Sequence, residues 1–142
     1  MNKVESADLI LKLYDLRREE KMREARAWII PFFPESAADI MQAMVNAETS
    51  AKFRMVTTYW DMAASFVNHG AIDEAMFTEI TGEHIVVFSK IEPFLEELRA
   101  NMGPNYLKNL ETLIMKQPDA KEMLAARREL MKRWMQARAE AA

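Results

Sequence analysis

The segment from Thr49 to His69 constrains the fold most, because its apolar side chains surround nearly the whole circumference of a helix. Its apolar members are Met55, Val56, Tyr59, Trp60, Met62, Ala63, Phe66 and Val67. A narrow polar stripe interrupts them, formed by Thr57, Asp61, Ser65 and Asn68. A helix that is apolar on nearly all sides is typical of the interior of a bundle. We therefore expect this helix at the centre of the fold, covered by its neighbours.

The rest of the chain is also predicted to be helical. Its one β-branched cluster, residues 85–87, lies within a segment whose larger apolar residues recur at helical spacing. Proline and glycine fall between the periodic segments, where helices begin and end. These positions are Pro31, Pro34, Gly70, Gly82, Gly103, Pro104 and Pro118. The pattern predicts an all-α bundle of six or seven helices that forms a single domain over residues 1–142.

Two of the predicted helices carry internal irregularities. The first spans about 6–30, and the apolar stripe of its second half is slightly out of phase with that of its first half. Residues 84–102 form a packing seam, but Pro93 lies inside it and cannot donate a hydrogen bond to the Ser89 carbonyl. We expect a kink at Pro93.

Aromatic side chains near two helix ends are candidates for an interaction surface. Trp28, Phe32 and Phe33 lie in an apolar corner that Pro31 and Pro34 prevent from being a regular helix. This corner either plugs one end of the bundle or exposes a patch for a partner or a membrane surface. On the final helix, Trp134 needs a covering surface, which either the bundle or a second chain provides.

Composition excludes several classes of function. The chain has 19 basic and 22 acidic residues, and residues 31–115 carry a balance of −7, which argues against a nucleic-acid partner. The absence of cysteine excludes thiolate catalysis and cysteine-ligated metals. The longest stretch without a charged residue is 62–72, too short for a transmembrane segment. With no signal-peptide pattern, a cytoplasmic location is expected.

Candidate chemistry is sparse. Phe66 and Thr81 stand three residues before His69 and His84, so the Glu-x-x-His pairs of di-iron bundles are missing. We expect no metal site and no cofactor. His69 is interpreted as a helix C-terminal residue that contacts the last carbonyls, and His84 as a partly exposed residue of a first helical turn.

Asp61 is the most notable acidic residue, because it lies on an apolar helix beside Tyr59 and Trp60. Burial would raise its pKa unless a cation or several donors stabilised the charge. We favour a structural ion pair with Arg54 or Arg99 over a role in catalysis.

Two segments in the middle of the chain carry a recognisable pattern, YWDMAASFVNHGAID at 59–73 and KIEPFLEELR at 90–99. They resemble a group of small all-helical bacterial proteins of unknown function. In that group a helix with a Gly-Ile-Asp-like end precedes a helix with an internal proline and a closing arginine. Many of its members carry an N-terminal membrane segment, which we do not find here. The resemblance implies a helical fold and a bacterial origin, and it supplies no catalytic residue.

These observations favour a non-enzymatic protein-interaction or regulatory module that self-associates through its first or last helix. The alternative is a small-ligand binding protein or enzyme with a pocket between helices near Tyr59, Trp60, Asp61 and His69. Peripheral membrane contact through residues 28–33 is a weaker third interpretation. The 12 methionines are dispersed along the chain, which favours an adaptable core over a binding groove.

Overall fold

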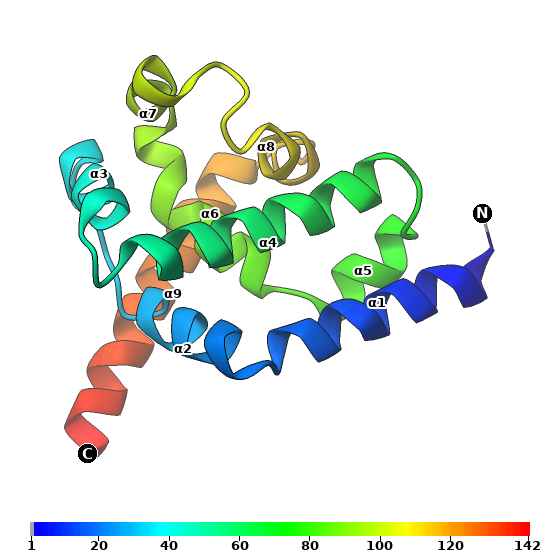
Figure 1. Ribbon diagram of the computed structural model, residues 1–142, viewed down its shortest axis with the longest axis horizontal. Coiled ribbons are helices and arrows are strands. Elements are labelled where there is room, and N and C mark those ends of the chain that lie inside the picture. Colours follow the sequence, from blue (N-terminus) through cyan, green and yellow to red (C-terminus); the bar gives the residue numbers. More distant parts are fainter. Residues whose placement is uncertain (1) are drawn as a thin grey trace.

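The computed structural model describes residues 2–142, and within this range the regular elements are all helices (Figure 1). The α-helices are α1 (Lys3–Arg17), α2 (Glu20–Ile29), α3 (Ala37–Val45), α4 (Ser50–Asn68), α5 (Glu74–Ile80), α6 (Glu83–Ile91), α7 (Leu95–Met102), α8 (Lys108–Ile114) and α9 (Ala120–Ala141). A 3-10 turn, η1 (Glu92–Phe94), separates α6 from α7. The all-α prediction is confirmed. The predicted count of six or seven helices is not, because two of the predicted helices are each divided.

The first division falls at Arg18 and Glu19, between α1 and α2. The Glu19 backbone is extended, and its carboxylate accepts a hydrogen bond from the Met22 amide at 3.0 Å, which caps α2. A single straight helix could not direct both apolar stripes at the core, since they are out of phase. The break reorients α2 so that Met22, Ala25 and Ile29 are buried.

The second division confirms the predicted kink at Pro93. The α-helical pattern ends at Ile91, continues as η1, and resumes in α7. The Ser89 carbonyl, which has no amide donor at Pro93, accepts a hydrogen bond from Nη1 of Arg128 on α9 at 2.7 Å. A side chain from another helix thus replaces the backbone hydrogen bond that proline removes.

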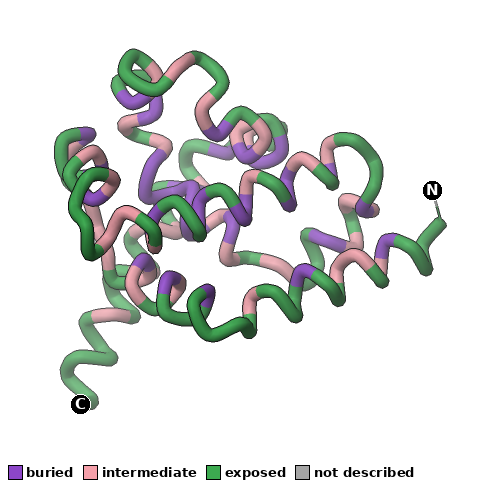
Figure 2. The backbone as a smooth tube through the Cα atoms, viewed as in Figure 1, coloured by how far each residue is buried: buried purple, intermediate pink, exposed green. Residues whose placement is uncertain are grey.

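The expectation that α4 is covered on nearly every side is not confirmed. Met55 and Met62 are each 37% exposed and Phe66 is 36% exposed. Exposed positions recur along α4 in Figure 2. The polar stripe is covered in part: Thr57 is buried, and its hydroxyl donates to the Phe53 carbonyl of the same helix at 2.9 Å, while Asp61, Ser65 and Asn68 are partly buried. Because Asp61 and Asn68 hydrogen-bond to residues at the start of α8, the neighbouring face with Met55, Met62 and Phe66 is the one left to solvent.

Helix α6 is more enclosed than α4. Seven of its nine residues are buried, among them Phe88 and Ile91. It packs chiefly against the first part of α9, while α4 lies between α2 and α8 (Figure 1). The far end of α9 extends from the body of the molecule to the C-terminus.

The difference in burial between α6 and α4 can be tested by replacing one phenylalanine on each helix and measuring the loss of stability. Phe88→Ala on α6 should lower the free energy of unfolding by about 3–5 kcal/mol, because it leaves a cavity at a fully buried site. Phe66→Ala on the exposed face of α4 should cost about 1 kcal/mol or less. Urea unfolding of both variants measures the difference, and equal losses would contradict the arrangement.

Candidate functional site

The most connected polar group of the molecule is the Glu83 carboxylate, at the start of α6. It accepts hydrogen bonds from Nε and Nη2 of Arg26 on α2, both at 2.9 Å, and from the Trp60 indole on α4 at 3.1 Å. The hydrogen bonds to Glu83 raise the pKa of the Arg26 guanidinium. A carboxylate is also favourable at a helix N-terminus. This cluster joins three helices at one acceptor.

Tyr59 and Trp60 line a small cavity that α4 forms with α1 and α5. The Tyr59 hydroxyl donates to the Leu13 carbonyl on α1, and the Arg17 guanidinium lies 5.6 Å from the centre of the Trp60 ring. Burial raises the pKa of Tyr59 to about 12, so this hydroxyl stays protonated. The cavity has a volume of about 50 Å³, which suits one or two water molecules at roughly 30 Å³ each rather than an organic ligand.

Asp61 faces the opposite side of α4 and caps α8. Its carboxylate accepts from the Leu110 amide at 3.0 Å and from the Asn109 side chain at 3.1 Å. Leu110 lies in the first turn of α8, where backbone amides have no helical acceptor. The expected ion pair with Arg54 or Arg99 is not among the contacts of the described residues, since these donors on the α8 side satisfy Asp61 instead.

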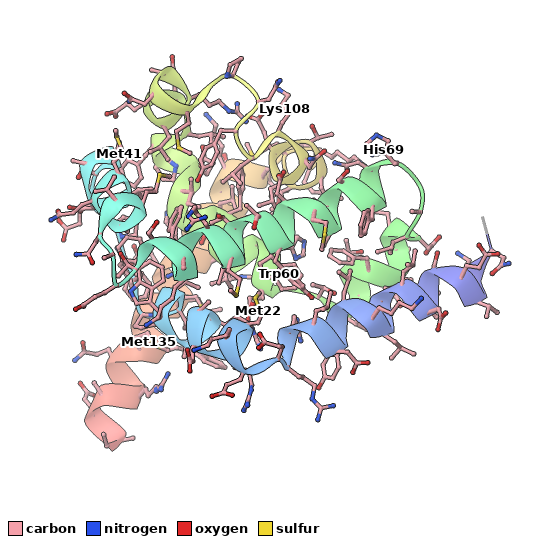
Figure 3. All side chains as sticks on the ribbon, in the orientation of Figure 1. Met22, Met41, Trp60, His69, Lys108 and Met135 are labelled. Carbon is pink, nitrogen blue, oxygen red and sulfur yellow. The ribbon has the colours of Figure 1, made fainter. Side chains whose placement is uncertain are left out.

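His69 lies at the C-terminal end of α4 and is exposed. Its Nδ1 donates to the Ser65 carbonyl at 2.9 Å, which confirms the predicted contact with the last carbonyls. Figure 3 shows Trp60 between α4 and the layer formed by α1 and α2, with His69 at the far end of α4. The structure therefore brings together Tyr59 and Trp60, but not Asp61 or His69.

His84 corrects the expectation of a partly exposed side chain, because it is only 2% exposed. Its ring lies 5.1 Å from that of Phe77 and 6.0 Å from that of Trp60. Burial, aided by the positive charge of Arg127, lowers the pKa of His84 to about 4. The sequence spacing could have predicted this burial, because His84 stands four residues before Phe88 and extends the buried seam of α6 by one turn.

The 30–34 corner is held by a residue that sequence analysis did not single out, Lys90 on α6. Pro31 and Pro34 interrupt the helix and leave carbonyls without helical donors. The Lys90 ammonium donates to the Ile30 and Phe32 carbonyls at 2.9 and 2.8 Å. The sequence does contain an indication of this role, because Lys90 lies within the largely apolar run 85–91, where a lysine needs a buried partner.

The aromatic side chains of this corner are partly buried, which is intermediate between the two predicted alternatives. Trp28 and Phe32 stack with ring centres 5.0 Å apart, and Trp28 meets Phe53 of α4 edge to face at 6.3 Å. Phe33 lies over Lys90, with 4.0 Å between the ring centre and Nζ. The corner is thus a packed end of the bundle that retains some accessible aromatic surface.

Trp134 has no such cover. Its side chain is 63% exposed, and Leu130, one turn earlier on α9, is 38% exposed. The described part of the bundle therefore does not provide the surface that Trp134 was expected to need.

These contacts define an all-helical protein whose principal polar clusters connect helices. A family model described as "Domain of unknown function (DUF4760)" matches residues 3–117, and the chain belongs to this family. The match confirms the resemblance to a family of unknown function, and α9 lies beyond the matched residues. Comparisons with curated proteins and with solved structures find no match.

Two kinds of site are absent from residues 2–142, a metal-ligand cluster and a membrane-spanning helix. No group of three or more His, Asp or Glu side chains is arranged to hold a metal ion. None of the described helices combines the length and the apolar composition that crossing a bilayer requires.

Breaking the Glu83 cluster should destabilise the fold. Glu83→Gln should lower the free energy of unfolding by about 2–3 kcal/mol, because Arg26 faces an amide group and loses its charged acceptor. Glu74→Gln is the matched control, since Glu74 pairs with Lys116 on the surface and should contribute less than about 1 kcal/mol. Urea unfolding of both variants tests this, and a loss in Glu83→Gln no larger than in the control would refute it.

His84 should make stability depend on pH. Its pKa is about 4 in the fold and 6.5 when exposed, so the unfolded chain binds the extra proton between these values. Stability should therefore fall as the pH drops from 6.5 to 4, by up to about 1.4 kcal/mol per unit from this group. His84→Phe should remove that part of the slope in urea unfolding measured across this range, whereas His69→Gln serves as a control at an exposed position. A slope unchanged in His84→Phe would rule out the assignment.

Proposed function

We propose that the chain is a single helical domain that acts as a non-enzymatic interaction module and self-associates through the second half of α9. The exposure of Trp134 is the observation that carries this proposal. Large aromatic side chains contribute disproportionately to protein interfaces, and tryptophan is the most typical of them.

Trp134 belongs to a continuous stripe along α9. Its members are Ala126, Leu130, Trp134, Ala137 and Ala141, at spacings of four, four, three and four, and all are exposed. This spacing keeps the side chains on one face of a helix, as in the seams of coiled coils. The alanines leave room beside Trp134 and Leu130 for a second helix to approach closely.

A second copy of this chain suits the stripe because the charges beside it have both signs. Glu129 and Glu140 are acidic, whereas Arg133 and Arg138 are basic. Two α9 helices packed side by side can therefore place opposite charges next to each other. Unlike a strongly basic face, this mixed pattern does not require an acidic partner.

The small-ligand alternative near Tyr59, Trp60, Asp61 and His69 has less support. Asp61 and His69 are engaged elsewhere, and the cavity beside Tyr59 and Trp60 is too small for an organic ligand.

Light scattering coupled to gel filtration, over a range of protein concentrations, tests self-association. The parent chain should form a dimer, and Trp134→Ala should weaken it at least tenfold, since truncating a central aromatic residue commonly costs more than about 1.4 kcal/mol. Truncating α9 is a poorer test, because Leu124 is fully buried in the core.

Leu11→Ala on α1 is the matched control, because Leu11 is 63% exposed, as Trp134 is. The Leu11→Ala variant should dimerise like the parent. If Leu11→Ala dissociates the dimer and Trp134→Ala does not, the interface lies on the first helix. A parent chain that is monomeric at all concentrations would reject self-association.

A further inference from the structure

A second cavity, separate from the exposed stripe of α9, lies where the 30–34 corner, the Pro93 kink and α9 meet. Its volume is about 200 Å³, room for roughly six or seven water molecules at about 30 Å³ each. The apolar part of its lining comes from Phe33, Pro34, Pro93 and Phe94. It is four times as large as the cavity beside Tyr59 and Trp60. A small organic molecule fits this space.

Three basic side chains share the same lining, Lys90 from α6 and Arg128 and Lys132 from α9. Lys90 is only 3% exposed, and carbonyl oxygens accept two of the three N–H bonds of its ammonium. Arg128 uses Nη1 for the Ser89 carbonyl, which leaves further guanidinium N–H bonds. Nζ of Lys90 also lies 4.0 Å from the centre of the Phe33 ring, so the unused N–H donors of the cavity come chiefly from Arg128 and Lys132.

The carboxylates nearby only partly balance this charge. Glu92 lies 3.9 Å from Arg128 and Glu129 lies 3.6 Å from Lys132, both long contacts compared with the 2.9 Å of the Arg26 and Glu83 pair. Glu35 is the one acidic residue that lines the cavity, whereas three of the lining residues are basic.

No ion pair of the described residues includes Lys90. Burial, together with the charge of Lys132, lowers the pKa of Lys90 to about 8. A buried ammonium without a carboxylate is costly, and an anion placed beside it would reduce that cost.

We propose that this cavity binds a small organic monocarboxylate with an aryl or short alkyl group. The carboxylate would lie among Lys90, Arg128 and Lys132, and the apolar group would pack against Phe33, Pro93 and Phe94. A few polar groups that orient a ligand in a mainly apolar cavity are typical of small-molecule sites. This proposal does not depend on self-association, because the stripe of α9 contributes no residue to the cavity.

Titration of the full chain with benzoate and with hexanoate, followed by two-dimensional NMR, tests the proposal. Saturable shifts should centre on Phe94, Lys90 and Arg128. The neutral analogues benzamide and hexanamide should bind at least tenfold more weakly, because they lack the charge. Inorganic phosphate should also bind at least tenfold more weakly, because it lacks the apolar group. Equal binding of acid and amide, or no saturable shift with either acid at millimolar concentration, would overturn the proposal.

The Lys90 side chain supplies a readout that a purely structural lysine would not give. Its titration midpoint, followed through the ¹³Cε resonance, should start near 8 and rise by about one pH unit when benzoate is bound. A midpoint unchanged by saturating benzoate would place the ligand elsewhere.

Two substitutions on α9 form a matched pair for this site. Lys132→Gln removes a half-exposed basic residue from the lining without breaking a core contact, and should weaken benzoate binding about three- to tenfold. Lys121→Gln removes an exposed lysine of α9 that lies outside this cavity and should bind as the parent does. Equal affinities in the two variants would reject the assigned location.

Discussion

The hydrogen bonds of the Glu83 carboxylate fix the positions of α2, α4 and α6 relative to one another, and the rest of the fold packs around these helices. One side chain at the start of α6 contacts Arg26 of α2 and the Trp60 indole of α4, so three helices far apart in the sequence meet at a single acceptor. A charged group this enclosed is tolerated only with such partners. Because these partners lie within the fold, neither Glu83 nor Arg26 is left without an opposite charge.

Buried lysine and arginine side chains solve a second problem, which the prolines create. Pro31, Pro34 and Pro93 stop helices inside the bundle and leave backbone carbonyls without their helical donors. Lys90 donates to two of these carbonyls and Arg128 to a third. The same two basic side chains line the cavity at the kink, so the repair of the backbone also concentrates positive charge there.

The sequence predicted the helical class, the kink at Pro93 and the contact of His69, because periodicity and proline chemistry act locally. It could not predict that Asp61 is covered by α8, because its partner Leu110 lies 49 residues further along the chain. Glu83 and Lys90 were missed because their partners lie far along the chain, 23 and 57 residues from Glu83 and 58 and 60 residues from Lys90. His84 was within reach of the sequence, because its spacing to Phe88 places it on the buried seam.

Helix α9 is anchored at one end and free at the other. Leu124 and Arg128 fix its first half to α6 and to the kink, whereas the residues after Met135 are all exposed. A continuous helix of 22 residues is about 33 Å long and bends little. Arg128 and the exposed end of α9 therefore belong to one continuous element, about 10–20 Å apart along its axis, and a change in the direction of the helix would alter the position of both.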